Sequence, residues 1–392
     1  MTSLLQQPAV KTTLSAFITS RFVVLFGMLL VLFIPGNQSD ITSGFYAAWY
    51  RWDAIHYVDI AVGRGYWYVP DSVSSIAFFP AYPMLLRALA LVIPDATAAG
   101  MLISNVTFFL ALIVIYLLAQ PYLKAADSQR AVFYLALFPA SLFFSAAYSE
   151  SLFLLFSALT WYAARRGANT RDWRWWLIAG LSGLICSATR AVGLLVVLFP
   201  LQEWLRSHQF SLTTVRTRAF WLSLLHDPFP AFTMALIPVG LLVFMLYLAL
   251  EFNDPLLFLR IQREGWGFES LGPVAIILRD AQGMLNGVPT SASAPLFYGW
   301  IDLAAFFLTL AVSVTLWRRM GWGVAIYSIL SLLLPISSRT ESMARYTAVL
   351  FPVFMVLALW GRHPVLDRVI RIVFILLLTL STTLFIKRFF VG

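Results

Sequence analysis

Long apolar runs recur along this chain, and they constrain its fold more than any other feature. A helix needs about 20 consecutive apolar residues to cross a bilayer. Only 11% of the 392 residues are charged, against about 25% in soluble domains, so the chain carries too little charge to cover a water-facing surface. The alternation of apolar and polar residues that is typical of membrane barrels is absent. The sequence therefore predicts an all-α polytopic integral membrane protein.

We expect about eleven transmembrane helices in a single domain that covers residues 1–392. They are placed near 16–34, 78–94, 98–119, 130–147, 149–165, 175–200, 231–250, 297–317, 322–337, 344–360 and 368–387. Two stretches, 35–77 and 251–296, are too polar to be simple spans and too long to be tight turns. The first apolar run is followed by no clear small-residue cleavage site, so we interpret it as a permanent span.

The excess of basic residues predicts the orientation of the chain. Its net charge of +9 is interpreted as cytoplasmic loops near anionic lipid rather than as nucleic-acid binding. The loop 201–230 and the turns 317–319 and 361–363 are basic, which places them in the cytoplasm and places 35–77 and 251–296 together outside.

One loop does not fit this count. Four arginines between residues 165 and 174 are placed outside, against the positive-inside tendency. Either this loop violates the rule, or segments 78–94 and 130–165 include a half-span or re-entrant piece. The answer decides which side of the membrane Glu150 faces.

The first polar loop, 35–77, mixes acids and bases with aromatic rings. Rings can stack on sugar faces, while charged groups can fix hydroxyls and phosphate. In a short surface helix, Asp53 would share a face with the side chains three and four residues later, and its carboxylate could take a proton from an acceptor hydroxyl. We predict Asp53 as the catalytic residue; the alternative is an ordinary juxtamembrane acid among aromatic anchors. The candidate substrate-binding residues of this loop are Trp52, His56, Tyr57, Arg64 and Tyr66.

Three charged residues interrupt apolar runs. Arg87 would cost roughly 2.5–3.5 kcal/mol at the bilayer centre, so it should face a partner or a wet cavity, or else extend its side chain to the interface. Glu150 and Arg190 could pair with each other and fix helix packing, or line a cavity that admits a charged lipid head. We favour the cavity for this pair.

The second polar loop and a late basic motif complete the candidate site. Gln262 and Trp266 are four residues apart and can present an amide and an indole on one helix face; an interfacial amphipathic helix is the alternative. Arg345, followed by Tyr346, is our candidate for binding a donor phosphate, and a helical pair with Glu341 is its alternative.

The sequence lacks the motifs of several common enzyme classes. The chain has no Gly-rich phosphate loop, no GxSxG, no HExxH and no Cys/His cluster, which makes nucleotide hydrolysis and zinc chemistry poor explanations. Its one cysteine, Cys186, allows no internal disulfide. Residues 16–165 and 231–387 show no repeat of the kind frequent in transporters.

The ordered set of these residues resembles the PIG-V family of GPI mannosyltransferase 2 and its bacterial relatives, within the GT-C superfamily of polytopic glycosyltransferases. The likeness extends over nearly the whole chain. Its parts are Trp52-Asp53, Tyr57, Gly65-Tyr66, Ala77-Phe78-Phe79-Pro80, Pro83, Leu86-Arg87, Phe138-Pro139, Tyr148-Ser149-Glu150-Ser151, Arg190, Gly193, Asp254-Pro255, Gln262, Trp266 and Arg345-Tyr346.

This resemblance implies an inverting enzyme that takes mannose from a polyprenyl (dolichyl-type) phosphate carrier. It implies an essential acid in the first extracytoplasmic loop, which corresponds to Asp53. The short chain is similar to the bacterial branch, which suggests the bacterial plasma membrane and a glycolipid, lipid-linked glycan or protein acceptor. Some enzymes of the superfamily use a divalent metal, and nothing in this sequence requires one.

Two other interpretations stay open from sequence. A GT-C transferase of another sugar would need the same residue types. A non-enzymatic lipid-glycan flippase or transporter would explain the intramembrane arginine and glutamate, but not the density of rings and carboxylates in the first polar loop.

Overall fold

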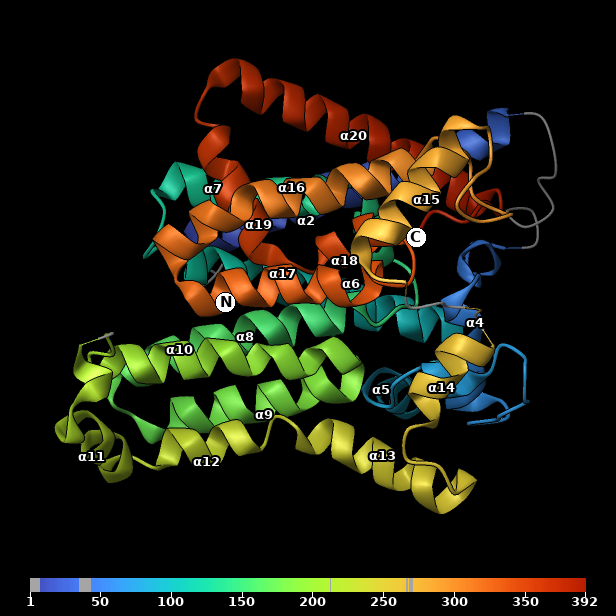
Figure 1. Ribbon diagram of the computed structural model, residues 1–392. Helices are drawn as coiled ribbons and strands as arrows, with labels where there is room; N and C mark the ends of the chain where they lie inside the picture. The colour runs from blue at the N-terminus through green and yellow to red at the C-terminus, as the bar shows by residue number, and fades with distance from the viewer. Residues whose placement is uncertain (1–7, 35–43, 212, 266, 268–270) are drawn as a thin grey trace.

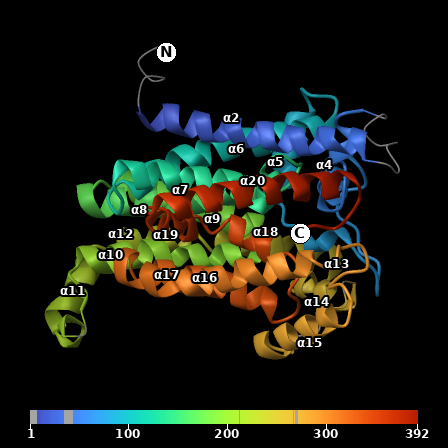
Figure 2. The same ribbon diagram turned by 90° about the horizontal axis from the view of Figure 1, so that it is seen from above.

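The computed structural model describes residues 8–34, 44–211, 213–265, 267 and 271–392. Over these residues the chain forms helices and no strands. Figure 1 shows the longer helices side by side in a bundle with two distinct ends. We name the end that carries α4 and α14 the Asp53 end, and the end that carries α10 and α11 the basic end; Figure 2 separates the same two ends from above.

Helices long and apolar enough to cross a membrane run through this bundle. They are α2 with the following 3-10 turn (Pro8–Phe33), α6 (Ala96–Ala119), α12 with α13 (Phe229–Phe252), α16 (Tyr298–Met320) and α20 (Pro364–Ile386). They support the integral membrane assignment. The number of eleven spans stays a prediction, because other apolar segments are broken into shorter pieces.

The remaining helices have the following bounds. In the bundle lie α7 (Ala125–Leu137), η4 (Pro139–Phe144), α8 (Glu150–Thr170), α9 (Trp173–Thr189), η5 (Ala191–Val197), α10 (Leu198–Ser207), α17 (Trp322–Ile336), α18 (Met343–Ala348) and α19 (Phe351–Trp360). Short helices at the ends are α4 (Asp53–Val62), α5 (Ala81–Ala90), α11 (Arg218–His226), α14 (Leu257–Glu264) and α15 (Pro273–Leu285).

The expected span 78–94 is wrong. Its helix, α5, has ten residues, which at 1.5 Å per residue reach about half of a 30 Å hydrocarbon core. Pro80 precedes its first turn and Pro94 follows its end, so the chain cannot extend the helix in either direction. The segment therefore stays at the Asp53 end.

The expected single span 175–200 is also wrong. The chain leaves α9 at Arg190, and η5 folds back against the end of that helix. Gly193 makes this approach possible, because a Cβ there would lie 2.2 Å from the carbonyl oxygen of Cys186. The segment is thus a hairpin whose turn carries Arg190.

These two corrections resolve the misplaced arginines. Because α5 does not cross the bundle, one crossing fewer precedes the loop 165–174, and this loop lies at the basic end. The hairpin at Arg190 adds one crossing after it, so the later loops keep their expected ends. Contacts confirm this position: Arg206 donates from Nη2 to Asn169 Oδ1 at 2.8 Å, and Gln202 of the same helix donates to Met320 O at 2.9 Å, next to Arg318 and Arg319. The basic loops therefore gather at one end, as the positive-inside rule predicts.

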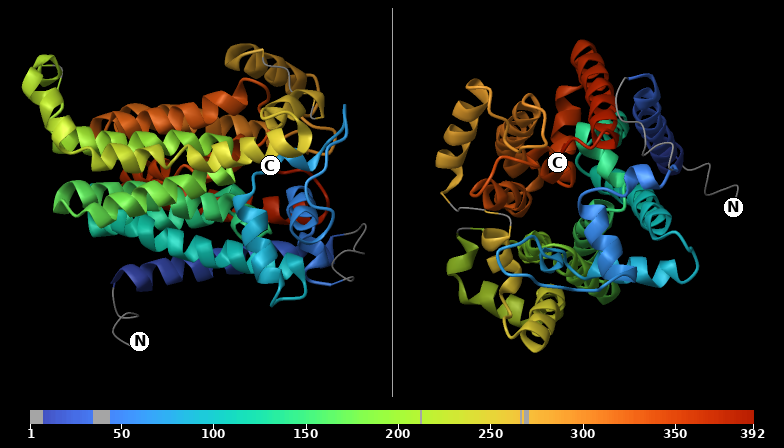
Figure 3. Two further views of the ribbon diagram at one scale, coloured as in Figure 1. Left: turned by 90° about the horizontal axis from the view of Figure 1, so that it is seen from below. Right: turned by 90° about the vertical axis from the view of Figure 1, so that its right-hand side faces the viewer.

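The two long polar loops meet at the other end, as expected. Ile76 of the first loop and Phe79, which follows this loop, pack with Phe258 and Ile261 of α14. The Tyr68 hydroxyl donates to Glu264 Oε2 at 3.2 Å. In the right-hand view of Figure 3 this end faces the viewer.

The first and last long apolar helices, α2 and α20, pack closely along each other. A Cβ on Gly27 would lie 2.7 Å from the carbonyl oxygen of Thr379, and the Thr383 hydroxyl donates to Gly27 O at 2.7 Å. Such contact requires a residue without a side chain, as at many helix crossings in membranes.

Candidate active site

Arg345 joins two acids that are far apart in sequence. Its Nη2 donates to Asp53 Oδ2 and its Nε to Glu150 Oε1. The Glu150 side chain is fully buried, whereas Asp53 keeps 16% of its side-chain surface exposed. The planar guanidinium suits this geometry because its donors point in fixed directions to two acceptors.

A second arginine completes the cluster. Arg190, at the turn between α9 and η5, also donates to Glu150 Oε1. Its Nε approaches Ser149 Oγ at 3.4 Å, and Tyr57 of α4 donates to the same oxygen at 2.8 Å. Residues from α4, α8, α9 and α18 therefore converge on one point.

Local structure fixes Asp53 within this cluster. Asp53 begins α4, where a carboxylate interacts favourably with the helix dipole. Trp52 before it has φ 51°, a left-handed value that is uncommon for a side chain of this size. Its ring packs edge-on against Phe390 at 5.3 Å.

A buried acid fixes the helix of Arg345. Asp302 of α16 is 3% exposed and accepts a hydrogen bond from Ala344 N at 2.8 Å. That nitrogen belongs to the first turn of α18, directly before Arg345. Aromatic rings enclose the guanidinium on the other side: its central carbon lies 5.0 Å from the Tyr148 ring and 5.2 Å from that of Phe143.

Several polar atoms beside the cluster have no hydrogen-bond partner among the described residues. They are Glu150 Oε2, the neighbouring Ser151 Oγ and the indole nitrogen of Trp52, all buried. Burying such groups without a partner is costly. Hydroxyl-rich ligands could pair with an acceptor and donors of this kind.

Two other charged residues of the first loop, Arg64 and Asp59, pair with each other. Arg64 is exposed and donates to Asp59 Oδ2 at 3.0 Å, and its guanidinium lies 4.6 Å from the Trp67 ring. Burial opposes ionisation of Asp59, but hydrogen bonds from Arg64 and Trp67 outweigh it and lower the pKa of this carboxyl. This pair lies apart from the contacts that join Asp53 to Arg345.

His56 lies against the aromatic rings of Phe78 and Trp67. Its ring stacks on Phe78, with centroids 4.6 Å apart. Burial lowers the pKa of this imidazole, although Asp53 and Asp59 act in the opposite direction. Tyr66 contacts the same segment, because its hydroxyl donates to Phe78 O at 2.8 Å.

The remaining predicted residues lie outside this contact set. Arg87 is exposed in the last turn of α5, in line with an interfacial side chain. Gln262 is half-buried on α14, and Tyr346 accepts a 3.5 Å contact from Arg339 Nη2. Trp266 lies outside the described residues. The alternative partner of Arg345, Glu341, instead pairs with Arg339 at 3.6 Å.

We next consider the side chains that could ligate a divalent metal. Among the described residues, no group of three or more His, Cys, Asp or Glu side chains is placed to hold an ion. The two acids of the candidate site, Asp53 and Glu150, are already joined by Arg345.

Sequence reasoning missed Asp302 and underestimated Ser149. Asp302 is the acidic residue inside the apolar run 297–317, and a carboxylate at such a position signals a buried partner. Ser149 gave no comparable signal, since a serine in a membrane helix commonly bonds its own backbone.

This chain is similar in part to several known proteins. GPI mannosyltransferase 2 of Schizosaccharomyces pombe is 29% identical over 126 residues, which are 31% of this chain and 26% of that protein. The oligosaccharyltransferase of Archaeoglobus fulgidus in its apo form gives a TM-score of 0.46 at 16% identity, over 96% of this chain and 55% of that one. The archaeal oligosaccharyltransferase from the same organism, in complex with an inhibitory peptide and a dolichol-phosphate, gives 0.45 at 14% identity, over 96% and 55%.

A family match by sequence covers more of this chain than the 126 residues shared with the yeast protein. The profile described as Mannosyltransferase (PIG-V) matches residues 12–256. This range is more than half of the 392 residues and includes Asp53, Glu150 and Arg190. The chain therefore belongs to the PIG-V mannosyltransferase family.

Proposed function

We propose that this protein is an inverting GT-C-type mannosyltransferase that uses polyprenyl-phosphate mannose and acts at the extracytoplasmic face of the membrane. Asp53 is its catalytic base. The acceptor is a membrane-associated glycolipid, lipid-linked glycan or protein. The membrane is the bacterial plasma membrane.

The observation that carries this proposal is the bridge from Arg345 to both Asp53 and Glu150. It joins three segments separated by as many as 292 residues, at the end of the bundle where both polar loops meet. A partly exposed acid held by a buried arginine, in a family of mannosyltransferases, favours a reaction centre over a packing contact.

The chemistry follows from these positions. Asp53 accepts the proton of an acceptor hydroxyl. The resulting oxygen attacks the anomeric carbon of mannose, a new C–O bond forms with inversion, and the bond from that carbon to the phosphate oxygen breaks. The electron pair leaves with the polyprenyl phosphate.

The two arginines bind the developing phosphate charge. Arg345 uses Nε and Nη2 on the acids, so its Nη1 remains to donate to a phosphate oxygen. Arg190 lies on the other side of Glu150. Trp52 and Tyr57 orient the sugars, and His56, Tyr66, Gln262 and Trp266 are further substrate-binding residues. Arg64, Arg87 and Tyr346 are peripheral binding residues.

The test compares two acids of the same helix. We expect Asp53→Asn to lower mannose transfer from purified polyprenyl-phosphate mannose by about 100-fold or more. Asp59→Asn, which changes only the local contacts with Arg64 and Trp67, should change the rate little. Wild-type turnover by Asp53→Asn would end the assignment of Asp53.

The same assay separates the alternatives. A transferase of another sugar would be silent with mannose and active with a different polyprenyl-phosphate sugar. A flippase would move labelled lipid across vesicles without forming a glycosidic bond. Mass spectrometry of envelope lipids and glycans, with and without the protein, identifies the acceptor.

A further inference from the structure

We propose that a pocket at the basic end binds the phosphate headgroup of an anionic phospholipid. The pocket has a volume of about 320 Å³ and lies between the last turns of α6 and α8. It uses none of Asp53, Glu150, Arg190 and Arg345, which we call the Asp53 cluster, so the inference is independent of the proposed function. Its lining residues are Leu117, Leu118, Gln120, Pro121, Tyr162, Arg165, Arg166 and Asn169.

The charge around the pocket is unbalanced. Arg166 is exposed, lies 5.4 Å from the Trp175 ring and has no ion pair with a carboxylate among the described residues. Arg165 contacts Glu203 Oε1 at 3.5 Å, and Arg206 contacts the same carboxylate at 2.7 Å. Three guanidinium groups against one carboxylate leave a net charge of +2.

The hydrogen-bonding groups of the pocket also favour an anion. The Asn169 Oδ1 atom accepts from Arg206 Nη2, so the amide NH₂ of Asn169 remains a donor. The Nε of Arg165 is buried with no hydrogen-bond partner within the described part of the chain. Phosphate oxygens accept from such donors, and hydrogen bonds to charged groups are the stronger ones.

The depth of the pocket selects a lipid as the source of the phosphate. α6 is a 24-residue apolar helix that ends at Ala119, and the pocket begins beside its last turn. A helix of that length reaches from one headgroup layer to the other. The apolar wall of Leu117, Leu118 and Pro121 suits the first acyl carbons. Basic pockets between transmembrane helices bind anionic headgroups in this way.

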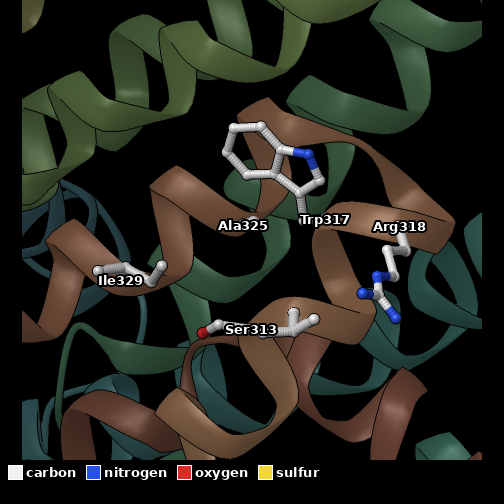
Figure 4. A pocket seen from close by; sticks show the side chains of 6 residues that line it. Ser313, Trp317, Arg318, Ala325 and Ile329 are labelled. Carbon is white, nitrogen blue, oxygen red and sulfur yellow. The ribbon is translucent and has the colours of Figure 1, made fainter.

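A second pocket at the same end provides the matched control. It lies between α16 and α17, has a volume of about 200 Å³, and presents one cation, Arg318, among Trp317, Ile329 and other largely apolar side chains (Figure 4). Because one arginine is a weaker anion site than three, we expect no selectivity for anionic lipid there.

Native mass spectrometry of the purified full chain tests the proposal. We expect the wild type to retain phosphatidylglycerol more tightly than phosphatidylcholine. Arg166→Gln should weaken phosphatidylglycerol binding by about tenfold, and Arg166→Lys should restore part of it. Arg318→Gln should leave both lipids unchanged.

Each other outcome overturns the assignment. Equal loss of both lipids in Arg166→Gln, or equal retention in Arg166→Gln and Arg318→Gln, would exclude a specific site at Arg166. Displacement of the lipid by inorganic phosphate at equal concentration would point to a soluble phosphate ligand. Thermal unfolding of the variants shows whether the fold is kept, and mannose transfer is not a readout, so this test can fail while the proposed function stands.

Discussion

Glu150 at the Asp53 end and Glu203 at the basic end form two clusters of the same composition. Each glutamate side chain is fully buried, and each faces two arginines. At the basic end one partner, Arg206, is three residues away and 46% exposed, and the other, Arg165, is 38 residues away. The Trp161 indole donates to the same carboxylate at 3.0 Å. At the Asp53 end the partners come from segments 40 and 195 residues away.

The difference lies in the second acid. Arg345 shares its guanidinium with Asp53, a partly exposed carboxylate from a polar loop, whereas no described contact gives Arg165 or Arg206 a second carboxylate. A buried glutamate between two arginines is therefore not by itself a sign of catalysis, since buried ion pairs also serve packing. An arginine shared by two acids is not decisive either, because Arg130 contacts both Asp127 and Asp367. What favours chemistry at the Asp53 end is that its second acid comes from the polar loop 35–77.

Replacing the bridging arginine should have the largest effect. Arg345→Lys cannot reach two acids with fixed donors, so the acids move apart and mannose transfer should fall by about 100-fold. Arg206→Lys at the basic end should change the rate little. Initial rates in membranes with matched protein amounts measure both; equal loss in the two variants would mean that the ends do not differ in function.

Removing the buried glutamates should affect stability in the same order. Glu150→Ala leaves two enclosed arginines without their shared carboxylate, and we expect unfolding free energy to fall by about 3–5 kcal/mol. Glu203→Ala should cost less, because Arg206 can turn towards water. Denaturant unfolding in detergent compares the two, and a larger loss in Glu203→Ala would reverse our ranking of the clusters.

Asp302 should have a smaller and more specific effect. Asp302→Leu leaves the amide of Ala344 buried without its acceptor, which costs about 1–3 kcal/mol and should shift Arg345, lowering kcat more than it raises KM. Asp302→Asn keeps an acceptor and should recover most of the rate. Thr309→Val, on the same helix, is the control; a fall in Asp302→Asn as large as in Asp302→Leu would contradict a positioning role.

The smallest effect concerns pH. The pKa of His56 lies below 6.5 in the folded protein because of burial. As pH falls, His56 therefore takes up a proton in the unfolded chain before it does so in the folded protein. Its contribution to the free energy of unfolding should be fully present above about pH 6.5 and decline as pH falls below that value. His56→Phe should flatten this part of the stability profile. An unchanged slope in His56→Phe would refute the contribution.

The sequence predicted the residue types of the site better than its connections. Glu150 and Arg190 were predicted as charges that interrupt apolar runs, Asp53 as an acid of the first polar loop, and Arg345 as a phosphate-binding residue. The structure brings these four together. Which arginine meets which acid depends on packing between distant segments, and no local pattern contains that information. Asp302 was missed because its role depends on a backbone amide 42 residues away.

The sequence predicted the helices correctly where the length of an apolar run determines them. The prediction was wrong where a helix is interrupted. Proline positions around 80–94 gave a clear signal against a full span, yet the apolar content of the run outweighed it. The hairpin at Arg190 requires Gly193 to meet the backbone of α9, a contact that appears only in three dimensions. The two errors compensated, so that the later loops were still assigned to the correct ends.

The pairing of Gly27 with Thr383 has a consequence for biogenesis. These residues are separated by 356 positions, so a ribosome releases the first helix long before its partner is synthesised. Until then the bare backbone groove at Gly27 must remain shielded, by lipid or by a membrane insertase. Translation that stops after Trp360 should therefore yield a product that quality-control proteases recognise, even though it contains every arginine and acid of the Asp53 cluster.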